Sequence, residues 1–167
     1  MTNILWLKGG ACSGNTMSFL SAEEPTVVEL VTDFGINILY HPTIALEIGE
    51  QVSNLLKDIL KGRLRVDIFV FEGSVIQGPN GTGSMNFFAD RPMQDWVRDL
   101  SKLAGYVVAI GDCAAWGGIP DILVSNQVVG ARKLARLAAL ARIAKVAVCA
   151  DDGCCAGAGS ARGARRR

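Results

Sequence analysis

The chain opens on the stretch Ile4-Leu5-Trp6-Leu7-Lys8-Gly9-Gly10-Ala11-Cys12-Ser13-Gly14-Asn15-Thr16, in which a short apolar run leads into a glycine-rich loop that carries a cysteine. An apolar strand, a tight loop and a helix start are the usual way in which an open α/β sheet presents a functional loop at its carboxyl edge. Glycines allow such a loop to turn with positive φ and to approach a ligand closely. Cys12 is then either a half-buried residue without a chemical role or a ligand of an iron–sulfur cluster.

Apolar runs and helical periodicity alternate along the chain after this loop. Helices are predicted over residues 16–20, after Glu23-Glu24-Pro25, over 45–61 and from Asp90 to Leu103, and further strands over 36–40, 66–71 and 106–110. This alternation predicts a mostly parallel sheet with helices on both faces, a three-layer α/β fold.

Three of the predicted strands end in loops that carry Cys12, Glu72 and Cys113 in turn. Because the carboxyl ends of parallel strands lie at one edge of a sheet, we expect these three residues to converge. Two cysteines at corresponding strand ends, each among glycines, favour the role of cluster ligand over that of an inert thiol.

The only histidine, His41, precedes Pro42 and is predicted to be a capped residue at a strand end rather than a ligand.

Composition limits the classes of protein that this chain can represent. Its 167 residues are enough for one domain with a sizeable core, and half of them are hydrophobic. We find no apolar run of the roughly 18 residues that a membrane span needs, and no secretory signal pattern at the amino terminus. Five unevenly spaced cysteines do not resemble a disulfide framework. These features predict a cytoplasmic protein, free or peripheral to the membrane, whose cysteines serve a metal or redox role.

The chain changes character close to Pro120. Residues 1–120 hold 8 basic and 13 acidic residues, whereas residues 121–167 hold 9 and 3, and no aromatic residue follows Trp116. We therefore divide the chain into a domain over 1–120 and a tail over 121–167, partly helical and then disordered. The basic residues of the tail are predicted to form a solvated helix face, not a surface for nucleic acid or membrane.

Several segments of the first 120 residues form recognisable motifs: Leu5 to Asn15 with Thr16-Met17-Ser18-Phe19-Leu20 after it, Phe71-Glu72-Gly73, Asn80-Gly81-Thr82-Gly83, Asp90-Arg91-Pro92-Met93 and Gly111 to Pro120. With these motifs the chain resembles the small, electron-transferring subunit of nickel–iron hydrogenases of the cytoplasmic uptake type. A more distant relation is the cluster-bearing subunit of respiratory complex I. The resemblance covers residues 3–120 almost continuously.

The resemblance implies an oxidoreductase subunit with a flavodoxin-like domain that holds the proximal [4Fe–4S] cluster. That cluster would receive electrons from hydrogen oxidation at the nickel–iron centre of a large partner subunit and pass them to a downstream acceptor. Cys12 and Cys113 match two of the family's cluster ligands. Many relatives carry another cysteine where Asn15 stands, so Asn15, a water or a different residue would fill that position. Glu72 matches a glutamate beside the subunit contact, with a solvated strand-end carboxylate as the alternative.

The same resemblance ends after Pro120. The tail lacks the Gly-Cys-Pro segment of the family, and no familiar ligand spacing surrounds Cys149, Cys154 or Cys155. Our hypothesis is that the chain is truncated or that its reading frame shifts near Pro120. With two family ligands retained, we expect the isolated chain to be inactive and poor at holding a cluster.

Two other functions stay open at this stage. The chain could be a cluster-free flavodoxin-like interaction module, or a cluster subunit of the complex I type. If it is a hydrogenase subunit, we expect Met17, Trp116 and the loop 77–85 to lie on an exposed apolar surface that contacts the large subunit.

Overall fold

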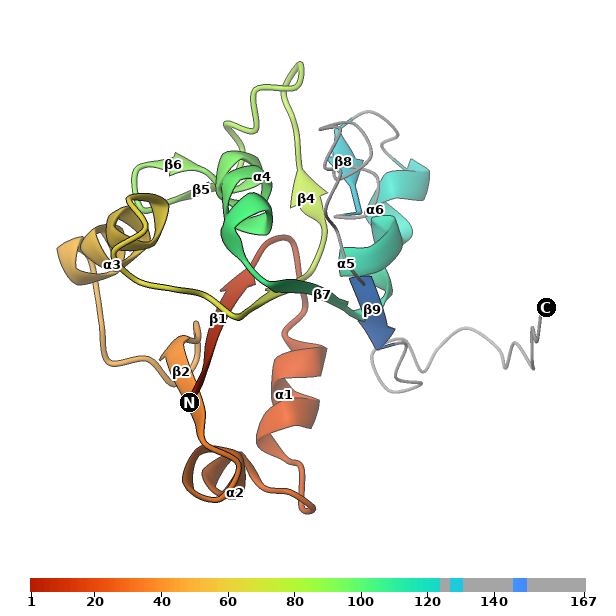
Figure 1. The fold of residues 1–167 in the computed structure, drawn as a ribbon. Helices are drawn as coiled ribbons and strands as arrows, with labels where there is room; N and C mark the ends of the chain where they lie inside the picture. The colour runs from red at the N-terminus through yellow and green to blue at the C-terminus, as the bar shows by residue number, and fades with distance from the viewer. Residues whose placement is uncertain (124–126, 131–145, 150–167) are drawn as a thin grey trace.

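A five-stranded parallel sheet forms the centre of the computed structural model, which describes residues 1–123, 127–130 and 146–149 (Figure 1). The strands lie in the order β2-β1-β3-β7-β9, and all four neighbouring pairs are parallel. Their bounds are Thr2–Lys8 (β1), Ile36–Tyr40 (β2), Ile68–Glu72 (β3), Tyr106–Ile110 (β7) and Val146–Cys149 (β9). The predicted parallel α/β fold is thereby confirmed.

Six helices connect or flank these strands within the described residues. They are α1 (Gly14–Leu20), α2 (Val27–Thr32), α3 (Glu50–Leu60), α4 (Met93–Leu103), α5 (Gly111–Trp116) and α6 (Gly118–Leu123). Side chains alternate across a strand, so Leu5 and Leu7 point to one face of the sheet and Trp6 to the other. Leu5 and Leu7 join the buried apolar cluster with α3 and α4, while Trp6 packs against Phe19 of α1. Helices therefore cover both faces of the sheet.

Two pairs of short strands lie within the loops that follow the carboxyl ends of the main strands. Strand β4 (Val75–Ile76) pairs antiparallel with β8 (Val128–Val129), and β5 (Phe87–Phe88) forms a hairpin with β6 (Arg91–Pro92). Strands β8 and β9 come from the predicted tail and pair with strands of the preceding part. The division at residue 120 stays a prediction, and the predicted tail helix and disordered end lie outside the described residues.

Several elements differ from the sequence-based expectation. The strand predicted over 66–71 spans Ile68–Glu72, and the helix predicted from Asp90 begins at Met93, because Arg91–Pro92 pair with β5. Two further differences concern helices. Helix α3 begins at Glu50 rather than at Ala45, because Gly49 has a φ of 54° and the Ile44 and Ala45 amides donate to the His41 carbonyl in a turn. Residues 111–116, expected as a loop, form α5. A helix of six residues between glycines is too short to show a periodic apolar pattern.

No described helix combines the length and the apolar character that crossing a bilayer requires.

Candidate metal centre

Backbone hydrogen bonds join the glycine-rich loop after β1 to the chain that follows β3. The Gly9 amide donates to the Glu72 carbonyl at 2.8 Å, and Gly10 and Ser74 exchange two hydrogen bonds at 2.9 and 3.0 Å. The loop that carries Cys12 is thus held at the carboxyl edge of the sheet, as predicted. The Cys12 side chain is exposed there.

Lys8 and Ser13 form a bridge across the Cys12 loop. The Lys8 Nζ donates to Ser13 Oγ at 2.7 Å, and Ser13 has a φ of 69° in the left-handed region. Such a conformation costs an ordinary residue about 1 to 2 kcal/mol, so the bridge helps to fix the turn between Cys12 and α1. Neither Lys8 nor Ser13 was recognised from the sequence, because a lysine at a strand end is usually only solvated.

Glu72 lies at the end of β3 and is fully buried. One carboxylate oxygen accepts the Thr16 backbone N–H at 3.2 Å. The other accepts a short hydrogen bond from the Thr16 hydroxyl and a longer one, at 3.4 Å, from the Trp6 indole. The alternative of a solvated strand-end carboxylate is therefore wrong. Glu72 instead anchors the first turn of α1 to the sheet.

Asn15 connects the Cys12 loop to the end of β7. The Asn15 side chain is buried, and its Nδ2 donates to the Ile110 carbonyl at 3.4 Å. Gly111, with a φ of 79°, follows directly, and a Cβ there would lie 2.4 Å from Asn15 Nδ2. The loops that follow β1 and β7 are therefore in contact, which confirms the predicted convergence of the Cys12 and Cys113 loops.

Cys113 is half-buried in α5, three residues beyond the end of β7. A Cβ at Gly118, whose φ is 65°, would lie 2.7 Å from the Cys113 sulfur. Glycine is needed here because the Cys113 sulfur packs directly against Gly118, where any side chain would collide with it.

Cys149 lies at the same edge by strand register. It is the last residue of β9 and pairs with Ile110, beside the loop that carries Cys113. Only the backbone of this strand is described. Cys154 and Cys155 lie outside the described residues.

An iron–sulfur cluster is the cofactor that the residues at this edge of the sheet would have to bind. Clusters are held by cysteine thiolates, commonly four. Among the side chains that the structure describes, no group of three or more histidine, cysteine, aspartate or glutamate residues is placed to hold a metal ion. The contact between the two cysteine loops and the register position of Cys149 nevertheless fit a cluster that is held by cysteines from separate segments of this edge.

His41 is a capped residue at the end of β2, as predicted. Its Nδ1 accepts the Thr43 N–H at 3.1 Å, and its ring packs against Trp6 and Phe19 with centroid distances of 4.7 and 5.9 Å. Burial lowers the pKa of His41, nearby Glu72 opposes that shift, and nearby Lys8 adds to it. The folded environment therefore favours the neutral imidazole over the charged one.

Large apolar side chains are exposed around the cysteine loops. Met17 is 65% exposed, Trp116 55% and Met85, in the loop expected to contact a partner, 66%. By contrast Trp6 and Trp96 are buried. The exposure of this surface agrees with the expectation for a subunit contact, while the contact itself stays a prediction.

Comparison with known proteins places this fold and these loops in a family. The family model described as NADH ubiquinone oxidoreductase, 20 Kd subunit, matches residues 12–164. The chain belongs to this family. The match runs through most of the part after Pro120, where we expected the resemblance to end.

Hydrogenase small subunits are among the relatives of this family member. The F420 non-reducing hydrogenase I small subunit of Methanosarcina mazei is 31% identical over 71% of this chain and 33% of its own length. The hydrogenase-2 small chain of Escherichia coli K12 is 33% identical over 70% of this chain and 30% of its own length. The chain thus spans about a third of the length of these relatives. Its predicted likeness to hydrogenase small subunits is confirmed, whereas the cytoplasmic uptake type stays a prediction.

The fold also matches that of a solved hydrogenase. The [NiFeSe] hydrogenase of Desulfovibrio vulgaris Hildenborough aligns with a TM-score of 0.73 at 24% identity, over 88% of this chain and 52% of that chain. At this identity the match supports the fold alone.

Proposed function

We propose that this chain is the electron-transferring part of a hydrogenase small subunit. In this proposal its carboxyl edge holds the proximal [4Fe–4S] cluster, which takes electrons from hydrogen oxidation in a nickel–iron large subunit. The observation that carries the proposal is the contact between the Cys12 and Cys113 loops, made by Asn15 on the Ile110 carbonyl. A bound cluster would supply reversible one-electron transfer.

The chain's own residues would position and shield that cluster. Cys12 and Cys113 would bind iron as thiolates, and we propose Cys149 as a third donor because it pairs with Ile110. Asn15 or a water would complete the set. Glu72 fixes the first turn of α1 through Thr16 and would thereby help to hold the Cys12 loop in place beside a bound cluster. Lys8, bound to Ser13, places a positive charge beside the same loop.

Anaerobic reconstitution with iron and sulfide tests the ligand set. We expect the visible absorption of an iron–sulfur cluster in the unmodified chain, at low yield, and its loss in the Cys12→Ala and Cys113→Ala variants. Cys149→Ala should also lose it, whereas Cys154→Ala, the matched control, should keep it. Equal behaviour of Cys149→Ala and Cys154→Ala would remove Cys149 from the proposed set.

A complex I type subunit is the second candidate, since the matching family model carries that description. Binding decides between the two functions. A hydrogenase small subunit should form a stable complex with a nickel–iron large subunit, and a complex I type subunit should not. A chain that binds this partner but holds no iron would instead be the cluster-free interaction module.

We also propose that the protein resides in the cytoplasm, free or peripheral to the membrane. Cell fractionation with compartment markers tests this localisation, and recovery in a periplasmic fraction would contradict it.

A further inference from the structure

We infer that Lys8 raises the reduction potential of the cluster proposed for this sheet edge, an inference that rests on the proposed function. Lys8 is the last residue of β1, and its ammonium group donates a hydrogen bond to Ser13 Oγ at 2.7 Å. Ser13 directly follows Cys12 in the sequence. The hydrogen bond therefore holds the lysine charge against the loop that carries the first proposed iron ligand.

The direction of the Lys8 side chain follows from its place in β1. Because side chains alternate along a strand, Lys8 lies on the same face of the sheet as Trp6, which packs against Phe19 of α1. Ser13 directly precedes α1, and Lys8 is half-buried. The ammonium group therefore lies between the sheet and the start of α1, where solvent screens a charge less than it does on an open surface.

Lys8 is the only basic residue in or next to three segments of this edge. Residues 9–16, 73–86 and 111–123 follow β1, β3 and β7, and they contain no lysine or arginine. Their charged residues, Asp112 and Asp121, are acidic, as is Glu72 at the end of β3. Cysteine thiolates bound to iron would add further negative charge. Lys8 is thus the one positive group that these segments and the strand ends before them supply.

The charge of Lys8 is not neutralised by direct contact. Within residues 1–123, 127–130 and 146–149, Lys8 forms no ion pair with a carboxylate. Glu72 is its neighbour by register on β3, but the Glu72 carboxylate accepts hydrogen bonds from Thr16 and Trp6 instead. Burial is the main cause that lowers the pKa of His41, Glu72 opposes that shift, and the charge of Lys8 adds to it. The influence of the ammonium group thus extends beyond Ser13.

A positive charge beside a cluster favours the reduced form. One-electron reduction adds one negative charge, and the reduction potential of iron–sulfur clusters depends on net charge and on nearby hydrogen bonds. The Lys8 ammonium group would stabilise that added charge by Coulomb attraction, which is stronger in a partly buried place than in water. An electron released by hydrogen oxidation in the large subunit would then be accepted more readily.

Redox titration of the cluster, followed by electron paramagnetic resonance, tests the inference on the chain produced with a nickel–iron large subunit. Lys8→Gln removes the charge and keeps a group that can donate to Ser13. We expect normal iron content and a shift of about ten-fold toward the oxidised cluster, which for one electron is a potential about 59 mV more negative. Lys8→Arg retains the charge and should keep the potential of the unmodified chain.

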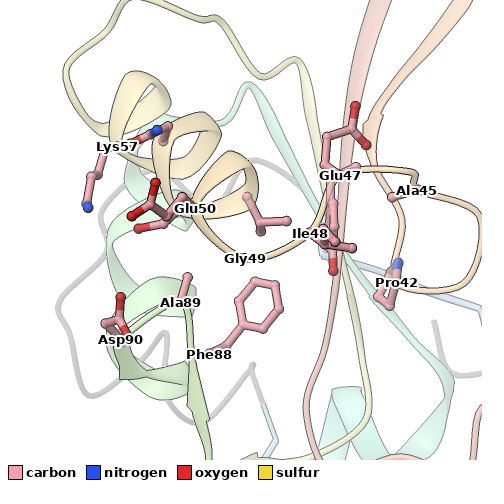
Figure 2. Close-up of a pocket in the computed structure, with 14 residues that line it drawn as sticks. Pro42, Ala45, Glu47, Ile48, Gly49, Glu50, Lys57, Phe88, Ala89 and Asp90 are labelled. Atoms are coloured by element: carbon pink, nitrogen blue, oxygen red, sulfur yellow. The ribbon is translucent and has the colours of Figure 1, made fainter.

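Lys57→Gln is the matched control, because Lys57 also forms no ion pair within the described part of the chain. Lys57 belongs to α3, which covers the face of the sheet opposite to α1, and it lines a cavity of about 780 Å³ (Figure 2). The described residues that line this cavity include none from the cysteine loops. The control should therefore leave the potential unchanged.

Ser13→Ala is a second variant, which serves also if Lys8→Gln fails to hold iron. It keeps the positive charge but removes the hydroxyl group that fixes the ammonium group beside Cys12. We expect a shift toward the oxidised cluster that is smaller than the ten-fold shift expected for Lys8→Gln.

Iron content and potential separate the inference from the proposed function. A chain that holds no iron in this complex would overturn the proposed function, and the inference with it. Normal iron content with an unchanged potential in Lys8→Gln and Ser13→Ala would overturn the inference alone. Equal shifts in Lys8→Gln and Lys8→Arg, or in Lys8→Gln and Lys57→Gln, would also overturn it, because the effect would then not depend on a charge at this place.

Discussion

Glu72 shows how a single residue links the sheet to the cysteine loop. Its carboxylate is fully buried and accepts hydrogen bonds from two groups of Thr16 and from Trp6. Replacement by glutamine would turn one acceptor oxygen into a donor that faces other donors. We expect Glu72→Gln to lower the free energy of unfolding by about 1 to 3 kcal/mol, measured by urea denaturation. The control Glu50→Gln, at an exposed position of α3, should change it by less than about 0.5 kcal/mol. Equal stability of both variants would contradict the anchoring role.

His41 makes stability depend on pH. Its folded-state pKa is lowered, with burial as the largest cause, so the folded state favours the neutral imidazole. The stabilising contribution is therefore present above the unfolded-state pKa of about 6.5 and is lost as the pH falls through the lower folded-state pKa. We expect the free energy of unfolding to drop between about pH 7.5 and 5.5, and to drop less in His41→Gln. Because His41 is the only histidine, identical pH profiles of the two proteins would exclude this explanation.

The residue types of the site were predictable, but their contacts were not. Cys12 and Cys113 were found because each follows an apolar strand and lies among glycines. The burial of Glu72 was not predictable from the sequence. The groups that donate hydrogen bonds to its carboxylate belong to β1 and α1, which lie more than fifty positions away in the sequence. Such contacts depend on the packing of α1 against the sheet, which local pattern does not encode.

At the scale of elements, the contact between α1 and the start of α5 keeps the two cysteine loops together. Gly111 combines a positive φ with a Cβ position only 2.4 Å from Asn15 Nδ2. We expect Gly111→Ala to destabilise the chain by more than the roughly 1 kcal/mol that left-handed backbone alone costs alanine. Gly62→Ala is the matched control, with a φ of 71° and no atom within 4 Å of its Cβ position. Thermal unfolding of both variants, alone and with Asn15→Ala, isolates the steric part. An equal loss for both glycines would contradict the close packing.

The bounds of the main sheet strands were more predictable than those of the helices, whereas the short strands β4, β5, β6 and β8 were not predicted. The strand over 36–40 was predicted with its observed bounds, because β-branched and apolar residues run up to a proline. Helix α3 was predicted too long, since apolar residues continue the helical spacing through Ala45 and Ile48, where Gly49 prevents a helix. A turn that satisfies backbone groups overrides periodicity in such a place.

At the scale of the whole molecule, the exposed apolar residues around the cysteine loops predict the surface for a partner. We expect the double variant Met17→Ala, Trp116→Ala to bind a nickel–iron large subunit at least about ten-fold more weakly, since large buried anchors dominate protein interfaces. Folding should not suffer, because both side chains are more than half exposed. Phe34→Ala removes a similarly exposed ring, at 65%, beside the amino end of the sheet, and should bind normally. Unchanged binding of the double variant would place the interface elsewhere.

The central claim is that Cys12 and Cys113 hold one cluster at this edge, and iron spectroscopy tests it most directly. The chain is produced with a nickel–iron large subunit in ⁵⁷Fe medium, and the iron bound by the small chain is examined by Mössbauer spectroscopy. We predict about four iron atoms per chain with the spectrum of a [4Fe–4S] cluster, which Cys12→Ala and Cys113→Ala each abolish and Cys154→Ala leaves intact. A chain without iron, or a cluster that survives both the Cys12→Ala and Cys113→Ala substitutions, would contradict the claim.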